Sequence, residues 1–365
     1  MKVIYFSLDY TPHDYRFLSA LAETDHEIYY VRLQRGPRQT EDRPVPAKIE
    51  QVQWAGGRDA FRWRGLPKYV TGLRRIIRRI RPDLVHAGPI QTCGLVAALA
   101  GFHPLLVMSW GFDLMQDADR NWLMRAITSY VLRFSDAFTS DCDATRRKAV
   151  QYGMDPARTT VFPWGVDLEN FRPQNSVVRR PSFVVFCNRS WEPRYGVDVL
   201  AKAFVTVAGR RSDVNLLLLG GGSQAQAIRQ ILERGGVLER VTFAGQVSNR
   251  DLPRCYHMAD LYVSPSHVDG SSVSLMEALA CGLPVVVSDI PANKEWVTDG
   301  ADGWLFPDGD ADALAAKILA AIESRKTLPK IGRAARLTAE ARADWKKNFP
   351  KLLETYQIAA ARRKE

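Results

Sequence analysis

A loop of small residues between a short apolar strand and a helix, in the segment 264–284, has the clearest potential for chemistry. Small side chains let the backbone approach a ligand closely, and the first amides of the helix, near Ser272, carry the positive end of the helix dipole. This combination predicts a diphosphate site. Glu277 follows in the first turn of the expected helix, where it can accept hydrogen bonds from vicinal hydroxyls such as those of a ribose. The residues expected around the ligand are Gly270, Ser271, Ser272, Val273 and Glu277.

The same helix start also has a purely structural interpretation. Ser274-x-x-Glu277 has the pattern of a capping box, in which the Glu277 side chain would only satisfy backbone amides. From the residues alone, both interpretations of Glu277 stay open.

Short apolar, β-branched runs alternate with helix-period segments along the whole chain, which is typical of an α/β protein with parallel sheets. The expected strands are 2–7, 27–32, 83–86, 104–109, 136–139 and 159–162 in a first set, and 183–187, 214–219, 241–244, 260–263 and 284–288 in a second. The polar, proline-containing stretch 170–176 favours a linker, and 310–362 is expected to be helical. We predict two Rossmann-like, doubly wound parallel-sheet domains facing a central cleft, residues 1–174 and 175–345. The C-terminal helix 346–365 is expected to pack back on the first domain.

Polar residues that follow the early strands are candidates for holding a second substrate. In an open parallel sheet, ligands bind beyond the carboxyl ends of the strands. The candidates placed there are His13, Asp14, Arg16 and His86. For each histidine, a hydrogen-bonded structural role is the alternative.

The bulk composition limits the class of protein. With 365 residues, of which 46% are hydrophobic and 25% charged, two domains with buried cores are expected. The five cysteines are odd in number and scattered without a CxxC pair, which argues for a reducing compartment and against structural zinc. The first strand meets Asp9 too early for a signal peptide, and no run of 18 apolar residues occurs. A cytoplasmic location fits these features.

The net charge of +10 is densest in the tract 74–81. Leu73, Ile76, Ile77 and Ile80 recur at helical spacing and line one face, so the arginines occupy the rest of the helix. One interpretation is a surface helix with solvated arginines, and the other is contact with an anionic membrane surface or a phosphate-bearing acceptor. Nucleic acid is not expected, because no aromatic residues interleave with the tract. The arginines concerned are Arg74, Arg75, Arg78, Arg79 and Arg81.

The segment that starts at Asp269 resembles the signature of glycosyltransferase family 4. In that signature an acidic residue is followed by seven residues of any type, a glutamate and the pattern Ala-x-Ala-x-Gly-x-Pro-Val-Val. Here Asp269-x7-Glu277 is followed by Ala278, Ala280, Gly282, Pro284, Val285 and Val286. The resemblance implies a GT-B fold and transfer, with retention, of a hexose-type sugar from a nucleotide-diphosphate sugar to a glycan or lipid-linked acceptor, as in cell-envelope glycan or polysaccharide biosynthesis. It also implies that Glu277 binds the ribose and that Asp269 contacts the sugar. The aspartate departs from the family's usual glutamate, so the identity of the donor sugar is not inherited.

The family resemblance assigns further contacts. Arg189 matches the family's arginine and Arg194 stands near its lysine, and two cations would stabilise the charge that grows on the leaving diphosphate. Trp110 replaces a histidine often found near the reacting sugar, in a loop that otherwise resembles the family's and ends at Asp113. The further donor-lining candidates are Gly220, Gly221, Gly245 and Val247.

The resembled family retains configuration, and no carboxylate here is an obvious nucleophile. The resemblance therefore implies front-face attack in which the donor diphosphate helps to take the acceptor proton, without a metal or cofactor. Asp-x-Asp patterns at 117, 141 and 310 spell the metal-binding motif of other glycosyltransferases, but they match helix starts, and Asp143 resembles an N-cap. Two alternatives stay open, a nucleotide-sugar epimerase on the same architecture and a catalytically silent sugar- or partner-binding protein.

Overall fold

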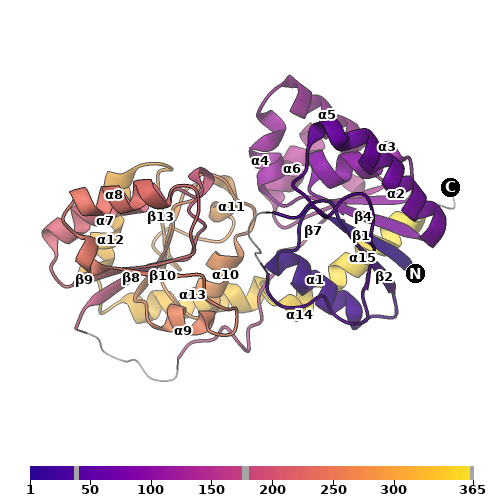
Figure 1. Cartoon of the computed structure of the whole chain (residues 1–365). Helices are drawn as coiled ribbons and strands as arrows, with labels where there is room; N and C mark the ends of the chain where they lie inside the picture. Colours follow the sequence, from indigo (N-terminus) through magenta and orange to yellow (C-terminus); the bar gives the residue numbers. More distant parts are fainter. Residues whose placement is uncertain (37–40, 175–180, 362–365) are drawn as a thin grey trace. The chain divides into compact units, whose positions relative to one another are not determined.

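The computed structural model describes residues 1–36, 41–174 and 181–361. The chain divides into two compact units (Figure 1). The first contains the residues up to Phe162 and those from Phe349 onward, and the second runs from Pro163 to Asn348. Each unit contains one parallel sheet flanked by helices. The predicted α/β class with two Rossmann-like parallel sheets is confirmed.

The first unit has a seven-stranded sheet whose paired neighbours all run parallel. In sheet order its strands are β3 (Glu50–Gln51), β2 (Glu27–Arg32), β1 (Lys2–Ser7), β4 (Leu84–Gly88), β5 (Leu105–Met108), β6 (Ala137–Ser140) and β7 (Thr159–Val161). Its helices are α1 (Pro12–Ala22), α2 (Leu66–Ile80), α3 (Leu95–Ala100), α4 (Phe112–Met115), α5 (Trp122–Phe134), α6 (Asp143–Gln151) and α15 (Pro350–Ala361). Shorter turns are η1 (Trp63–Gly65), η2 (Ile90–Gly94), η3 (Asp117–Asp119) and η4 (Pro156–Arg158).

The second unit has a six-stranded sheet, again parallel throughout. In sheet order its strands are β10 (Val241–Gly245), β9 (Val214–Leu219), β8 (Phe183–Cys187), β11 (Leu261–Ser264), β12 (Val285–Ser288) and β13 (Trp304–Phe306). Its helices are α7 (Val197–Arg210), α8 (Ala225–Arg234), α9 (Leu252–His257), α10 (Val273–Ala280), α11 (Pro291–Lys294), α12 (Ala311–Glu323), α13 (Leu328–Arg342) and α14 (Trp345–Asn348). Shorter turns are η5 (Pro193–Tyr195) and η6 (Leu238–Arg240).

In each sheet the first strand of the unit lies in the interior, between its successor and a later strand. β1 pairs with β2 on one side and β4 on the other, and β8 pairs in the same way with β9 and β11. The direction of winding reverses at these strands, and such reversal points are where open α/β sheets bind ligands. The loops that follow β1 and β4 therefore open at one edge of the first sheet, and those that follow β8 and β11 open at one edge of the second.

The eleven predicted strands are all present, with ends that differ by no more than two residues. The prediction missed β3 and β13, which are edge strands. Glu50 and Gln51 of β3 are exposed, so they carry no apolar signal, and β13 is a three-residue strand behind Gly303. The stretch expected to be helical from 310 onward is divided into four helices, α12 to α15.

The C-terminal helix α15 contacts β4, β5, β6 and β7 of the first unit, and it is the yellow helix beside those strands in Figure 1. Its Tyr356 hydroxyl lies 2.9 Å from Nδ1 of His86 in β4, and both side chains are almost fully buried. Burial lowers the pKa of His86 to about 3, so the imidazole is neutral at physiological pH. The prediction that His86 binds an acceptor is wrong, because this side chain points into the core beneath α15.

The segment that precedes the predicted linker belongs to the second unit. Val166 donates its backbone N–H to Ala343 at 2.7 Å and accepts from Trp345 at 3.1 Å. The Arg336 guanidinium also reaches the carbonyl of Phe171 at 2.9 Å. The division between the units therefore falls after Phe162, whereas the expected boundary after 174 adjoins residues 175–180, which lie outside the described residues.

We expect Tyr356→Ala to lower the free energy of unfolding of the first unit by about 3–5 kcal/mol, because it removes a large aromatic side chain from the core and deprives His86 of its partner. Ile358→Ala is the matched control, since this residue lies on the same helix with 42% of its surface exposed and should cost less than about 1 kcal/mol. Hydrogen exchange of β4 and β5 amides in urea measures both. Equal effects of the two substitutions would contradict the assigned packing of α15.

Candidate functional site

A buried arginine lies directly beyond the carboxyl end of β8. The Arg189 side chain is 8% exposed. Its Nη2 lies 2.6 Å from Oδ2 of Asp269, and its Nη1 donates to Oγ of Ser272 at 2.8 Å. The Tyr195 ring lies under the guanidinium, 4.4 Å from Cζ to the ring centre. Three of the predicted donor-site residues are thus in direct contact.

Arg189 and Asp269 each favour the charged form of the other. Burial lowers the pKa of Arg189, but the Asp269 carboxylate and neighbouring groups such as Tyr195 together raise it above its usual value, so the guanidinium stays charged. Burial also raises the pKa of Asp269, and the Arg189 charge opposes that shift. The arrangement keeps this ion pair in a desolvated position, where the attraction between the guanidinium and the carboxylate is stronger than in water.

The turn η5 is locked against the loop that follows β11. Gly196 has φ of +59°, and a Cβ added there would lie 2.1 Å from the carbonyl oxygen of Pro265, so only glycine fits. The Arg194 carbonyl accepts the backbone N–H of His267 at 2.9 Å. This contact holds Tyr195 against Arg189 and leaves Arg194, half-buried, beside the same loop.

The start of α10 differs from the predicted capping box. Ser272 is the N-cap, and its Oγ accepts from the amide of Leu275 at 3.4 Å. Because Val273 is the first helical residue, Glu277 lies in the second turn of α10. Ser274 and Glu277 therefore do not form the predicted capping box. Ser271 is fixed separately, because its Oγ accepts from Nε1 of Trp296 at 2.9 Å.

Glu277 instead belongs to a buried hydrogen-bond network. The hydroxyl of Tyr256 in α9 donates to Oε2 of Glu277 at 2.8 Å and lies 3.0 Å from the carbonyl of Ser274. It accepts from the Asn188 amide at 2.9 Å, and Oδ1 of Asn188 accepts from Tyr262 at 3.0 Å. Glu277 is only 4% exposed, and burial holds the pKa of Tyr256 well above its usual range, so the phenol stays a donor.

Sequence reasoning missed Asn188, Tyr256 and Tyr262 as site residues. The available signal was that Asn188 directly precedes Arg189 at the end of β8. The two tyrosines gave no such signal, because they come from α9 and β11 and meet Glu277 only in the folded chain.

The glycine turns after β9 and β10 meet at the same edge of the second sheet. Gly220 has φ of +87° and donates its N–H to the Gly245 carbonyl at 2.6 Å. The carbonyl of Gly221 accepts the N–H of Trp191 at 3.1 Å. An ideal Cβ at Gly245 would meet no atom within 4 Å, so this turn borders open space, and Val247 is half-buried two residues later. The structure places these candidates beside the residues that follow Arg189.

In the first unit, His13 and Trp110 come together and Asp14 turns away from them. The rings of His13 and Trp110 lie 5.7 Å apart, and both side chains are half-buried, as is Arg16. Trp110 covers Gly88, where a Cβ would lie 2.7 Å from the indole nitrogen. Asp14 is fully buried and forms a capping box with Thr11 at the start of α1, so the prediction that it binds an acceptor is wrong.

Asp113 organises two loops of the first unit from within. Its Oδ1 accepts from Ser109 Oγ at 2.6 Å and from the amides of Trp110 and Leu114 at 3.0 Å, and Oδ2 accepts from the Ile90 amide at 3.0 Å. Burial raises the pKa of Asp113 to about 6, while these hydrogen bonds oppose the shift. The side chain is completely buried, so it positions Trp110 and does not itself contact a ligand. The predicted direct contact is wrong.

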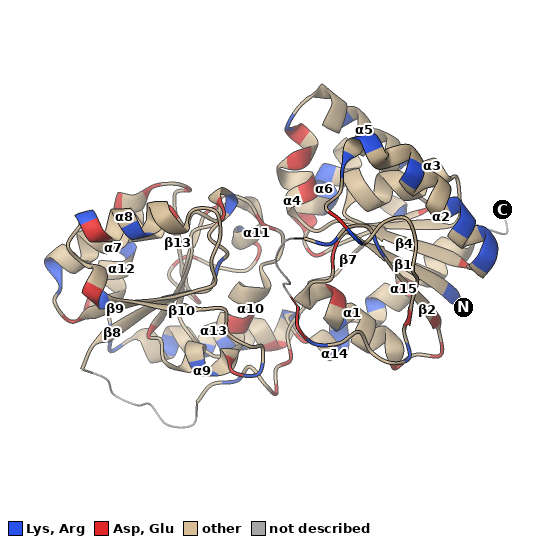
Figure 2. Cartoon of the chain, viewed as in Figure 1, with Lys and Arg blue, Asp and Glu red and all other residues tan. Residues whose placement is uncertain are grey.

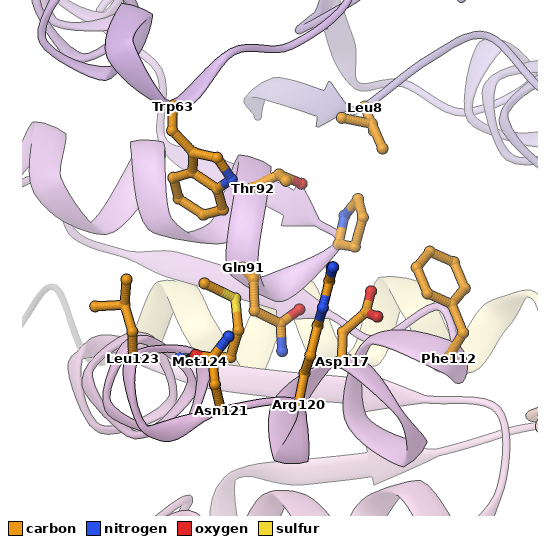
Figure 3. Close-up of a pocket in the computed structure, with 11 residues that line it drawn as sticks. Leu8, Trp63, Gln91, Thr92, Phe112, Asp117, Arg120, Asn121, Leu123 and Met124 are labelled. Atoms are coloured by element: carbon orange, nitrogen blue, oxygen red, sulfur yellow. Dashed lines mark hydrogen bonds between the residues drawn. The ribbon is translucent and has the colours of Figure 1, made fainter.

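A pocket of about 440 Å³ opens within the first unit (Figure 3). Leu8, Pro89 and Phe112 place it beyond the carboxyl ends of β1, β4 and β5. The sequence analysis selected none of its lining residues as acceptor contacts. They are Leu8, Trp63, Pro89, Gln91, Thr92, Phe112, Asp117, Arg120, Asn121, Leu123 and Met124.

The Asp-x-Asp patterns are engaged in local contacts. Asp310 caps α12 by accepting from the Ala313 amide at 2.9 Å, and Asp119 bonds to Tyr152. Asp143 is the first residue of α6 and pairs with Arg146, while the N-cap is Cys142, so its predicted capping role is wrong. Within residues 1–36, 41–174 and 181–361, no group of three or more His, Cys, Asp or Glu side chains could hold a metal ion.

Two Rossmann-like parallel-sheet units, with polar residues gathered where each sheet reverses its winding, are the architecture of the GT-B glycosyltransferases. The chain belongs to the glycosyl transferases group 1, that is, to glycosyltransferase family 4. The model of that family matches residues 168–338, and that of the glycosyl transferase 4-like domain matches residues 13–165. In the described part of the chain, no helix is both long and apolar enough to cross a membrane.

Among similar proteins, a phosphatidyl-myo-inositol mannosyltransferase of Mycobacterium leprae is 33% identical over 72% of this chain and 67% of its own length. A GDP-mannose-dependent alpha-(1-6)-phosphatidylinositol monomannoside mannosyltransferase of Mycolicibacterium smegmatis is 26% identical over 79% and 80%. The solved sucrose-phosphate synthase of Thermosynechococcus elongatus has the same fold, with a TM-score of 0.84 at 19% identity over 98% of both chains. The epimerase and the silent binding protein therefore gain no support.

We expect Tyr256→Phe to lower the free energy of unfolding of the second unit by about 1–3 kcal/mol, because it keeps the ring but leaves Glu277 and Asn188 without their shared hydroxyl. Tyr195→Phe is a control for loss of a hydroxyl alone, since Tyr195 contacts Arg189 through its ring, and it should be nearly neutral. Urea titration followed by hydrogen exchange in β8 and β11 measures both. An unchanged stability of Tyr256→Phe would mean that the network adds nothing to folding.

Proposed function

We propose that this chain transfers a hexose-type sugar, with retention of configuration, from a nucleotide-diphosphate sugar to a hydroxyl of a lipid-linked or glycan acceptor in cell-envelope biosynthesis. The observation that carries the proposal is the contact of Arg189 with Asp269 and Ser272 at the start of α10, next to the buried carboxylate of Glu277. A cation, helix amides and a carboxylate are together what a diphosphate joined to a ribose requires.

The proposed roles follow from these positions. Arg189, with Arg194 beside it, and the first amides of α10 would stabilise the charge that develops on the leaving diphosphate. Glu277 would accept hydrogen bonds from the ribose hydroxyls, while its Oε2 keeps the hydrogen bond from Tyr256. Asp269 would hold Arg189 in place and contact the sugar. Further donor contacts are proposed for the residues Gly220, Gly221, Gly245, Val247, Gly270, Ser271 and Val273.

GDP-mannose is the first donor to test. One similar protein is described as a mannosyltransferase and another as GDP-mannose-dependent, and both act on phosphatidylinositol-type lipids by name. We propose front-face attack with the donor diphosphate as proton acceptor, without a metal or cofactor. The fixed positive groups around Arg189 would supply the electrostatic stabilisation, and the bound geometry would supply orientation. For the acceptor, we propose contacts with His13, Arg16 and Trp110.

We expect GDP to raise the thermal midpoint of the protein when compared with UDP, ADP and dTDP. A ligand at 100 times its dissociation constant stabilises the folded state by about 2.7 kcal/mol, which corresponds to several degrees for a unit of this size. Glu277→Gln should weaken GDP binding by about 10- to 100-fold, because a charged acceptor of the ribose hydroxyls is lost. A fluorescence-based thermal titration measures both constants.

Two controls sharpen this test. Glu233→Gln removes an exposed carboxylate at the end of α8 and should bind GDP as the unmodified chain does. A GDP analogue that lacks both ribose hydroxyls should bind the unmodified chain as weakly as GDP binds Glu277→Gln, and it should show no further loss in that variant. If the analogue and GDP bind the unmodified chain equally, Glu277 does not recognise the ribose.

We further propose that α2 contacts an anionic membrane surface at the cytoplasmic face. Its buried stripe is Val70, Leu73, Ile76 and Ile80. Arg74 is engaged elsewhere, because its guanidinium donates to the carbonyls of Leu99 and Ala100 at the end of α3. The exposed arginines Arg75, Arg78 and Arg79 have no ion-pair partner among the described residues, and Figure 2 shows the basic residues along this helix.

Flotation with vesicles that contain 30 mol% phosphatidylserine tests this role of α2. The triple variant Arg75→Glu, Arg78→Glu, Arg79→Glu should lose at least about tenfold in membrane partitioning, because each basic residue near the surface contributes about 1 kcal/mol. The matched control reverses three exposed arginines of the second unit, Arg210, Arg234 and Arg250, with the same change in net charge. Equal losses in the two triple variants would show that net charge, and not α2, governs the partitioning.

A further inference from the structure

The pocket of the first unit has a mouth of exposed apolar side chains. Trp63 of η1 and Leu123 of α5 both line it, and each is 46% exposed. Trp122, next to Leu123, is 78% exposed. The described part of the chain has seven large apolar side chains with high exposure, and four of them lie on η1 and α5. These four are Trp63, Trp122, Leu123 and Tyr130. Exposed apolar residues that gather around a cavity mark a binding surface more often than isolated ones do.

The polar side chains of the wall are largely used within the fold. Nε2 of Gln91 donates to the Asp113 carbonyl at 2.8 Å and to Oγ1 of Thr128 at 2.9 Å. Oδ1 of Asn121 accepts from the Met124 amide at 2.9 Å, which caps α5. A ligand in this pocket therefore meets mainly hydrocarbon surface, and the volume of about 440 Å³ lies in the range of small-molecule sites.

One side of the pocket carries charged residues of both signs, Arg120 and Asp117. Figure 3 shows the Arg120 side chain extending into the pocket, close to Asp117 and Gln91. Arg120 has no ion-pair partner in the described residues, and neither have Arg62 and Arg64, the exposed arginines that flank Trp63. Since η1 runs directly into α2, the mouth of the pocket is continuous in the chain with the helix proposed to meet the membrane.

We infer that this pocket binds the hydrocarbon chain of a lipid-linked acceptor, with Arg120 pairing with the anionic group where chain and head join. Trp63 and Leu123 enclose the chain at the mouth, and Trp122 lies outside at the depth of the membrane interface, where tryptophan is favoured. The inference rests on the proposed function, because it concerns the acceptor of the same transfer. It narrows the acceptor to a lipid-linked one and adds the residues that select it.

A chain-length series of alkyl phosphates, from hexyl to dodecyl and below their micelle concentrations, tests the inference by calorimetry on the full chain. Affinity should rise about threefold to fourfold with each methylene until the pocket is full, and then level off. Inorganic phosphate, which has no chain, should not bind measurably at the same concentrations. An affinity that does not change with chain length would overturn the inference.

Two exposed leucines provide a matched pair of variants that should both fold. Leu123→Gln should flatten the chain-length series and weaken dodecyl phosphate at least tenfold. Leu337→Gln, on α13 of the second unit with 65% of its surface exposed, should leave the binding of dodecyl phosphate unchanged.

Arg120→Gln should weaken the binding of dodecyl phosphate about tenfold. It should not affect the binding of dodecyl glucoside, which has no anionic group. Equal weakening by both leucine variants, or no effect of Leu123→Gln, would show that the chain binds elsewhere.

Nucleotide binding separates this inference from the proposed function. If GDP, UDP, ADP and dTDP all fail to bind, the proposed transfer fails, whatever the alkyl phosphates do. If a nucleotide binds but the affinity for alkyl phosphates does not change in the Leu123 and Arg120 variants, the proposed transfer is retained and this acceptor subsite is wrong. Turnover with a short-chain and a long-chain acceptor then gives the last check. Leu123→Gln should raise KM for the long-chain acceptor and leave kcat and the KM of the donor unchanged.

Discussion

The contact between Arg189 and Asp269 is the interaction on which the second unit depends. A guanidinium that is 8% exposed is costly to bury without a partner, and removal of one partner from a buried pair typically costs about 3–5 kcal/mol. Asp269 can serve only if the loop after β11 stays beside the end of β8. The sheet order places these two strands next to each other, and Gly196 lets η5 close over the same loop. The ion pair therefore fixes three segments that are far apart in the sequence.

The first unit also contains buried charged groups, but they are carboxylates. Its buried carboxylates, Asp14 and Asp113, accept hydrogen bonds from backbone amides and hydroxyls of their own loops, and Asp113 also accepts from the Ile90 amide of a second loop. They shape the edge of the sheet without reaching a ligand, and they leave half-buried rings such as Trp110 at the surface of that edge. Charged residues thus have opposite uses in the two units. In the second unit a buried arginine is held by an aspartate, and in the first unit buried carboxylates are held by backbone amides and hydroxyls.

The sequence predicted the parallel sheets because buried strands leave a clear apolar pattern, and it failed for the edge strands β3 and β13, which are short or exposed. It also selected the loops after β8 and β11, whose residues Arg189, Asp269 and Ser272 are in contact, because small and charged residues directly after a strand can be recognised in the sequence. It could not distinguish a ligand contact from an internal one at His86, Asp14 and Asp113. A ligand contact and an internal contact at these positions differ only in the direction of the side chain. That direction depends on partners such as Tyr356 and Ile90, which are distant in sequence. The pocket was missed for the same reason, because its apolar wall is assembled from η1, η2 and α5.

The aspartate at 269 gains a physical explanation from this geometry. A carboxylate shorter by one methylene stays close to the loop backbone, and its Oδ1 also accepts from the Gly270 amide at 3.1 Å while Oδ2 reaches Arg189. One oxygen is thus used by the loop and the other by the cation. A glutamate would carry its carboxylate one methylene farther from the loop backbone, whereas Asp269 keeps its two oxygens at the Gly270 amide and at Arg189. The short side chain therefore holds the buried guanidinium against the loop that follows β11.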